Sequence, residues 1–148
     1  MSELRARELA REDVAACIAV MRSNTPLFFA PQELAEYEGW MRRSPLPYIV
    51  VTSDEEIVAC GGYRIEPATR VAGLTWGMVR RDAQRRGAGT FLLRERLARI
   101  RAAGALTLEL DTSQRSRAFF ERFGFAAFRE TADGYAPGLD RIEMRLAL

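Results

Sequence analysis

Hydrophobic residues along this chain follow a strand pattern, then a helical pattern, and then a strand pattern again. A short strand is expected around residues 4–10. Apolar residues then recur at the i, i+3, i+4, i+7 spacing of an amphipathic helix over residues 14–21, and Pro31 opens a second helix. From residue 48 to residue 80 the pattern changes to three apolar runs separated by polar turns, which predicts an antiparallel meander.

The second half of the chain alternates helices with strands. A glycine-rich turn at residues 87–89 leads into a long helix, and a strand is expected over residues 106–110. A fourth helix over residues 113–123, a strand over residues 125–129 and a closing strand to residue 148 complete the pattern. The sequence therefore predicts an α/β sandwich with four helices and a mixed sheet of about seven strands. No repeat or linker divides it, so residues 1–148 are expected to form one domain.

The basic residues exclude several classes of chemistry. All 22 are arginine, and the chain has neither lysine nor histidine. Histidine-activated nucleophiles, histidine-ligated zinc sites and lysine Schiff bases are therefore excluded. Proton transfer must use carboxylates, tyrosine, cysteine, main chain or water. Because 20 acidic residues leave a net charge of only +2, nucleic acid is not an expected partner.

Two further patterns bear on the environment of the protein. Cys17 and Cys60 lack the C-x-x-C spacing of a metal or redox site, which favours two buried thiols in a reducing compartment. No apolar run of about 18 residues is present, so a membrane partner is not expected. The expected location is the cytoplasm.

Residues 84–90, Gln-Arg-Arg-Gly-Ala-Gly-Thr, lie between a predicted strand and a predicted helix. Free N–H groups and the dipole at a helix start favour an anion, and glycines allow close approach, so the segment suits a pyrophosphate. The phosphate loop of nucleotide triphosphatases needs a lysine that this chain lacks. The dinucleotide fingerprint would use Gly87, Gly89 and Glu109, but Leu92 occupies its third glycine position. Taken alone, the glycines also fit a tight connection.

A third interpretation accounts for more of the chain. The pattern Gln84-x-x-Gly87-x-Gly89 resembles the Q/R-x-x-G-x-G/A pyrophosphate loop of the GNAT superfamily of acetyltransferases. Residues 108–113 and 118–125 resemble the second cofactor motif of that family, a strand followed by a helix that ends in Gly-Phe. The resemblance covers nearly the whole chain and is weakest over residues 22–47. It implies a GNAT-like, mostly antiparallel sheet with splayed strands at the site of acetyl-CoA, and no metal.

The resemblance also implies which residues hold acetyl-CoA. The backbone of Met78 and Val79 would pair with the pantetheine arm, which lies between two diverging strands. The other implied cofactor residues are Gln84, Arg85, Arg86, Gly87, Ala88, Gly89, Thr90, Ser113 and Phe120. Two of these depart from the family pattern, because Ser113 replaces an asparagine and Phe120 replaces the tyrosine that commonly protonates the leaving thiolate. Without the resemblance, Phe120 would be read as a core residue.

The implied reaction is direct attack of a neutral amine on the thioester, without an acyl-enzyme. Glu109 and Asp111, on one face of a strand, are alternative candidates for the base that takes the proton of the amine. Tyr135, in a loop expected over residues 133–140, is the candidate acid in place of Phe120. Each also fits an ordinary surface position.

Aromatic residues around the first two helices would line the acceptor site, namely Phe28, Phe29 and Tyr37. They favour a small cationic or aromatic amine as the acceptor, although they would also serve to pack the helices on the sheet. Two alternatives stay open: a silent GNAT-fold module that binds acetyl-CoA without transferring it, suggested by Phe120, and a peptide N-terminal acetyltransferase. A homodimer would be consistent with the superfamily.

Overall fold

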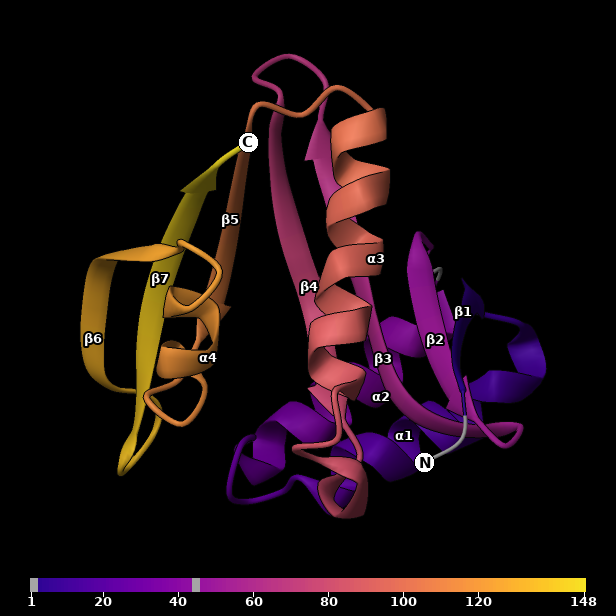
Figure 1. The fold of residues 1–148 in the computed structure, drawn as a ribbon. Helices are drawn as coiled ribbons and strands as arrows, with labels where there is room; N and C mark the ends of the chain where they lie inside the picture. Colours follow the sequence, from indigo (N-terminus) through magenta and orange to yellow (C-terminus); the bar gives the residue numbers. More distant parts are fainter. Residues whose placement is uncertain (1–2, 44–45) are drawn as a thin grey trace.

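A sheet with the strand order β1-β2-β3-β4-β5-β7-β6 runs through the molecule in the computed structural model (Figure 1). The structure describes residues 3–43 and 46–148. The strands are β1 Leu4–Glu8, β2 Tyr48–Ser53, β3 Glu56–Glu66, β4 Val71–Val79, β5 Thr107–Thr112, β6 Ala126–Ala136 and β7 Leu139–Ala147. The helices are α1 Val14–Ser23, α2 Pro31–Arg43, α3 Ala88–Ala102 and α4 Arg117–Glu121, with short 3-10 turns at Arg11–Asp13 and Arg81–Ala83. The predicted seven strands and four helices are confirmed.

Helices cover both faces of the sheet, with α3 and α4 on one face and α1 and α2 on the other (Figure 1). Leu93, Leu97 and Ile100 of α3 pack on β4 and β5 through Ala72 and Leu108. A second core lies under α1 and α2 and contains Cys17, Val20, Met21, Tyr37, Met41, Tyr48, Val50, Cys60 and Met78. Both cysteines are free and fully buried, which confirms the prediction of buried thiols. Within the described residues, no helix is long and apolar enough to cross a membrane.

Strands β4 and β5 form the one parallel pair among the described strands, and they pair over a short length. Val71–Gly73 of β4 pairs with Thr107–Glu109 of β5, and no pairing joins the two strands beyond Gly73. The strands then diverge towards the end of the sheet where α3 begins (Figure 1). The predicted splayed strands are therefore confirmed, and residues 74–79 of β4 have one backbone edge without a neighbouring strand.

A β-bulge bends β4 within this unpaired segment. Cys60 of β3 faces Met78, and Gly62 faces Thr75, so two residues of β4, Trp76 and Gly77, lie opposite Gly61 alone. Trp76 adopts a positive φ of 42° at the bulge. An extra residue on one strand bends that strand and increases its twist. The bulge therefore contributes to the separation of β4 from β5.

Two element boundaries differ from the predictions. The helix expected over residues 113–123 is limited to α4, because Ser113 O accepts the N–H groups of Ser116 and Arg117 (both 3.1 Å) in a preceding turn. The strand expected over residues 125–129 continues to Ala136 and takes in the first half of the expected loop, and β7 begins at Leu139 within that loop. Its polar residues resemble a loop because β6 is an edge strand with mainly exposed side chains, and pairing with β7 decides its conformation.

Asp13 joins β1 to the start of α1 through a buried carboxylate. It accepts hydrogen bonds from Arg7 Nη1 (2.7 Å), Arg7 Nη2 (3.0 Å) and Ala10 N (2.7 Å). These bonds, led by those from Arg7, hold the pKa of Asp13 below its usual range. The carboxylate therefore stabilises the fold above the usual pKa of about 3.9, and the contribution is lost as the pH falls through the lowered pKa.

Replacing Asp13→Asn is therefore expected to lower the free energy of unfolding by about 1–3 kcal/mol at pH 7, because the partners of Asp13 lose an ionised acceptor. Near pH 3, below the usual pKa of an aspartate, the difference from the parent chain should shrink, since the unfolded parent chain then binds a proton at Asp13 that the folded chain binds less readily. Urea unfolding at both pH values measures this, with the exposed Glu12→Gln as the control. An equal loss at both pH values would contradict the role of the charge.

Candidate functional site

The connection from β4 to α3 leads into the N-terminus of a 15-residue helix. Gly87, with a φ of 89°, is the N-cap of α3, a backbone conformation that glycine adopts readily. The first N–H bonded within the helix is that of Phe91, which donates to Gly87 O (2.9 Å). Among the described residues, the N–H groups of Ala88, Gly89 and Thr90 have no main-chain partner. Together with the helix dipole they can bind an anion.

Three segments far apart in the sequence meet at Gly89. A Cβ atom at this position would lie 3.5 Å from Val79 Cγ2 and 3.5 Å from Phe119 Cζ. The end of β4, the start of α3 and one face of α4 therefore converge here. The structure thus brings together the two segments in which the sequence predicted cofactor contacts.

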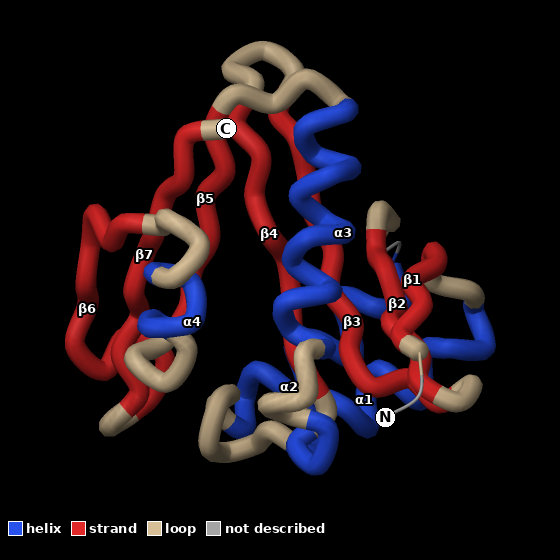
Figure 2. Tube along the Cα trace, in the orientation of Figure 1, coloured by secondary structure: helices blue, strands red, loops and turns tan. Residues whose placement is uncertain are grey.

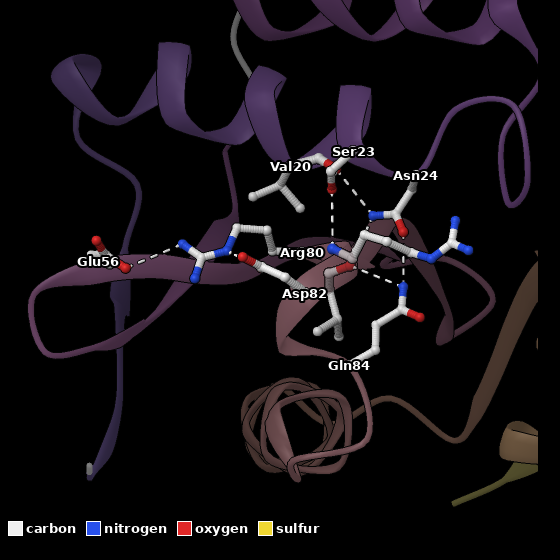
Figure 3. Close-up of polar contacts among 9 residues, drawn as sticks. Val20, Ser23, Asn24, Glu56, Arg80, Asp82 and Gln84 are labelled. Carbon is white, nitrogen blue, oxygen red and sulfur yellow. Dashed lines mark hydrogen bonds and ion pairs between the residues drawn. The ribbon is translucent and has the colours of Figure 1, made fainter. Parts of the chain in front are cut away.

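The four arginines around this connection have different surroundings. Arg80 pairs with Asp82 (2.5 Å) and with Glu56 (3.4 Å), as Figure 3 shows. Arg81 lies over the ring of Phe28, with 5.8 Å from its Cζ to the ring centroid. Arg85 and Arg86 are exposed and have no ion pair among the described residues. They remain available to an anionic ligand at the start of α3.

Gln84 contacts other parts of the protein with its amide nitrogen. Gln84 Nε2 donates to Asn24 Oδ1 (2.8 Å), as Figure 3 shows, and also to Val79 O (3.3 Å). Asn24 Nδ2 donates to the same carbonyl (2.8 Å) and to Val20 O (3.0 Å). Asn24 is 1% exposed. It is a positioning residue that sequence reasoning missed, because Asn24 before Thr-Pro predicts only the end of a helix.

These bonds leave one backbone donor of Val79, its N–H group, without a partner among the described residues. Arg80 N donates to Val58 O of β3 (2.7 Å). Successive residues of a strand direct their backbone groups to opposite sides, so the N–H and C=O of Val79 point away from β3. The carbonyl is taken by Asn24 and Gln84. The N–H group of Val79 therefore faces the space between β4 and β5.

The α1–α2 connection is attached to the β4–α3 connection, and the two lie side by side in Figure 2. Ser23 Oγ accepts the N–H of Arg81 (3.1 Å), and Asn24 O accepts the N–H groups of Phe28 (2.8 Å) and Phe29 (3.2 Å). Asn24 thus holds the end of β4 with its side chain and the two phenylalanines with its backbone.

The predicted acceptor aromatics occupy two environments. Phe29 is partly buried and lies against Trp76 of the bulge, with ring centroids 6.4 Å apart. Tyr37 is fully buried, and its hydroxyl lies 2.7 Å from that of Tyr48, which donates to Trp76 O (2.8 Å). Burial raises the pKa of Tyr37. Tyr37 therefore supports the bulge from within the core.

The two candidate bases are engaged by arginines of β7. Glu109 Oε2 accepts from Arg145 Nε (2.8 Å), and Asp111 Oδ2 accepts from Arg141 Nη2 (2.8 Å). Leu108 and Leu110 point into the core with α3. Side chains alternate along a strand, so Glu109 and Asp111 lie on the opposite face of the sheet. Helices α1 and α2 cover that face further along the sheet. Both carboxylates can take part in proton transfer only from within an ion pair.

Tyr135 lies near the end of β6 and contacts α2. Its main-chain oxygen accepts a hydrogen bond from Gln32 Nε2 (2.8 Å). Burial, and then the charges of Asp111 and Glu33, raise the pKa of Tyr135. The side chain therefore stays protonated at neutral pH and can act as a hydrogen-bond donor.

The α4 region supplies apolar contacts. Phe120 packs against Phe119 and Phe125, with ring centroids 5.1 and 5.6 Å away. Ser113 is 5% exposed, and its Oγ accepts the N–H of Arg115 (3.2 Å). Phe120 has no proton to donate, so residue 120 of α4 cannot act as a side-chain acid.

Comparisons with known proteins agree with this geometry. The sequence model of the Acetyltransferase (GNAT) family matches residues 10–125. A Desulfovibrio desulfuricans protein described as a GNAT-family acetyltransferase is 26% identical, with 98% of this chain and 99% of that chain covered and a TM-score of 0.83. Ribosomal-protein-S18-alanine N-acetyltransferase from Escherichia coli is 19% identical (98% and 94% covered, TM-score 0.79). PaiA N-acetyltransferase from Thermoplasma acidophilum, solved with coenzyme A, is 16% identical (99% of each chain, TM-score 0.77). No protein of curated function matches the sequence.

Proposed function

The chain belongs to the acetyltransferase (GNAT) family, and from this we propose that it transfers an acetyl group from acetyl-CoA to a primary amine of a small molecule. The observation that carries the proposal is a set of donors at one end of the sheet that have no partner within residues 3–43 and 46–148. It comprises the N–H of Val79, the N–H groups at the start of α3 and the two free arginines that follow Gln84. This arrangement fits a ligand with a pyrophosphate and an extended amide chain.

The residues present fit the parts of acetyl-CoA in order. Arg85, Arg86 and the N–H groups of residues 87–90 would hold the pyrophosphate. The N–H of Val79 would bond an amide oxygen of the pantetheine arm, which extends from there along Met78 towards the bulge. Ser113 and Phe120 would flank this path from the β5 and α4 side. Acetyl-CoA supplies the activated acetyl group, and the protein supplies its placement.

The amine must reach the bulge in its neutral form, because an alkylamine with a pKa of about 10.4 is mostly protonated at neutral pH. We expect the acceptor on the face of the sheet that carries Asp111 and Glu109, and these carboxylates would take the proton, directly or through water. Tyr135 and Phe29 would border the acceptor, with Phe28 beside the cofactor loop. A main-chain N–H of β4 would polarise the thioester carbonyl.

Binding of acetyl-CoA tests this proposal directly. We expect acetyl-CoA at 100 times its dissociation constant to stabilise the protein by about 2.7 kcal/mol, because it binds only the folded chain. Thermal unfolding with acetyl-CoA, CoA and NAD measures this, with NAD as the matched nucleotide control. Stabilisation by NAD alone would overturn the proposal.

Turnover separates the proposed enzyme from a silent acetyl-CoA-binding module, which the chemistry of Phe120 favours. Thiol release should be followed with a panel of small cationic and aromatic amines and with short peptides that carry a free N-terminus. Turnover with small amines supports the proposal, and turnover with peptides alone favours an N-terminal acetyltransferase. Binding without turnover on any of these acceptors favours the silent module.

A further inference from the structure

Arg96 of α3 lies buried against the bulge of β4. Arg96 is 4% exposed. A Cβ atom at Gly61 would lie 2.9 Å from Arg96 Nη1, and a Cβ atom at Gly77 would lie 2.7 Å from Arg96 Nη2. A side chain at either position would crowd the guanidinium in its observed place. The bulge of β4 and the guanidinium of Arg96 are therefore in direct contact.

The guanidinium has fewer partners than its burial requires. Nη1 donates to Gly62 O (3.2 Å), and Nε is buried without a hydrogen-bond partner in the part of the chain that the structure describes. No carboxylate forms an ion pair with Arg96 among the described residues. Burial lowers the pKa of Arg96 to about 10, so the side chain is still charged at neutral pH. A buried charge is costly unless it is paired, so an unpaired one calls for a partner that the free protein lacks.

The position of the charge identifies the kind of partner. A pantetheine arm that starts at the N–H of Val79 and runs along Met78 next reaches Gly77. Gly77 is exposed, whereas the guanidinium that contacts its α3 side is buried. The sulfur end of the ligand would therefore come close to a cation that is shielded from water. Charges interact more strongly in such surroundings than in bulk water.

We propose that Arg96 stabilises the CoA thiolate that leaves during acetyl transfer. This inference rests on the proposed function. The amine nitrogen forms a bond to the acetyl carbon, and the C–S bond breaks with its electron pair moving to sulfur. The amine nitrogen loses one proton to a carboxylate or water, and the products are the acetamide and the CoA thiolate. A nearby cation allows sulfur to leave as an anion.

This role of Arg96 explains how the reaction can proceed with phenylalanine, instead of an acid, at residue 120. Phe120 packs between Phe119 and Phe125 and cannot protonate sulfur. Stabilising the thiolate by charge removes the need for a proton donor there. Arg96 thus performs by electrostatics what a tyrosine would perform by proton transfer.

The binding of CoA as a function of pH tests the inference without any acceptor. If Arg96 favours the thiolate, the pKa of the bound thiol lies below that of the free thiol. The affinity for CoA then rises between these two pKa values as the pH rises, whereas acetyl-CoA has no thiol to titrate. We expect the ratio of the two dissociation constants to change about tenfold between pH 6.5 and 9.5, a shift of about one pKa unit.

The variant Arg96→Met fills the same slot without the charge, and its ratio of dissociation constants should change little with pH. Arg96→Lys keeps a cation and should retain part of the dependence. Tyr48 of β2 and Cys60 of β3 are the titratable groups that the charge of Arg96 reaches, and the acetyl-CoA control removes their contribution. Ultraviolet absorbance of the bound thiolate gives an independent reading of its pKa.

Each outcome decides a different point. A pH-independent ratio in the parent chain, or an unchanged dependence in Arg96→Met, would overturn the role of Arg96. If Arg96→Met fails to fold, Arg96→Lys decides, because a flat ratio there contradicts a role for the charge. If neither CoA nor acetyl-CoA binds the parent chain, the proposed function itself fails.

Discussion

Replacing Gly89→Trp should reduce the affinity for acetyl-CoA at least about 100-fold, which corresponds to about 2.7 kcal/mol of binding free energy. A methyl group at residue 89 fits, since its Cβ would lie in ordinary contact with Val79 Cγ2 and Phe119 Cζ at 3.5 Å. Atoms beyond the Cβ would collide with these side chains or extend over the free N–H groups of α3. Either result blocks the pyrophosphate.

Isothermal titration with acetyl-CoA measures the effect, and Gly89→Ala is the matched control that should bind within a few-fold of the parent chain. The unliganded variants should first be compared by circular dichroism, because loss of the contact with α4 would change the fold. Normal binding of acetyl-CoA by a folded Gly89→Trp variant would contradict the assignment of the pyrophosphate site to the start of α3.

Replacing Asn24→Ala should lower the free energy of unfolding by about 2–4 kcal/mol and weaken acetyl-CoA binding more than tenfold. The change removes donors to Val20 O and Val79 O, and it removes the acceptor for Gln84. Each of these three hydrogen bonds contributes about 0.5–1.5 kcal/mol, and Val20 O and Val79 O keep their bonds from Ser23 Oγ and Gln84 Nε2. The affinity for acetyl-CoA falls as well, because the end of β4 and the following loop are no longer held together.

A double-mutant cycle with Gln84→Ala shows whether the pair acts as a unit. If it does, Asn24→Ala with Gln84→Ala should bind acetyl-CoA about as weakly as Asn24→Ala alone. Ser23→Ala is the neighbouring control, since it removes the bonds of Ser23 Oγ with Arg81 N and Val20 O and leaves the carbonyl of Val79 bonded. Additive effects of Asn24 and Gln84 would mean that the two side chains act independently.

Periodicity predicted the order of the elements because most of them bury one face. Residues 14–21 form part of α1, and the strands from residue 48 to residue 80 form β2 to β4. Edge strand β6 was the exception, since its exposed side chains have no apolar alternation and its extent is set by pairing with β7. The splayed sheet was predicted through the family resemblance, since no local pattern states where two parallel strands separate.

The site was predicted in part for a similar reason. The glycine loop is a local motif, so its place at the start of α3 could be inferred from neighbouring residues. Asn24 acts on Val79, which lies 55 residues further along the chain, and Arg96 acts on Gly61 and Gly77 of two other strands. Such contacts depend on how the elements pack, and residue spacing contains no information about them.

The unpaired edge of β4 also has a consequence for inhibitor chemistry. A competitor of the natural ligand would first have to supply carbonyl groups at the spacing of an extended peptide, since Val79 offers a main-chain donor and its own carbonyl is already taken. Backbone mimics such as short amide oligomers with a terminal diphosphate would meet that requirement. Flat aromatic fragments would leave the strand edge unsatisfied. Screening libraries for this site should therefore be selected by amide geometry before aromatic content.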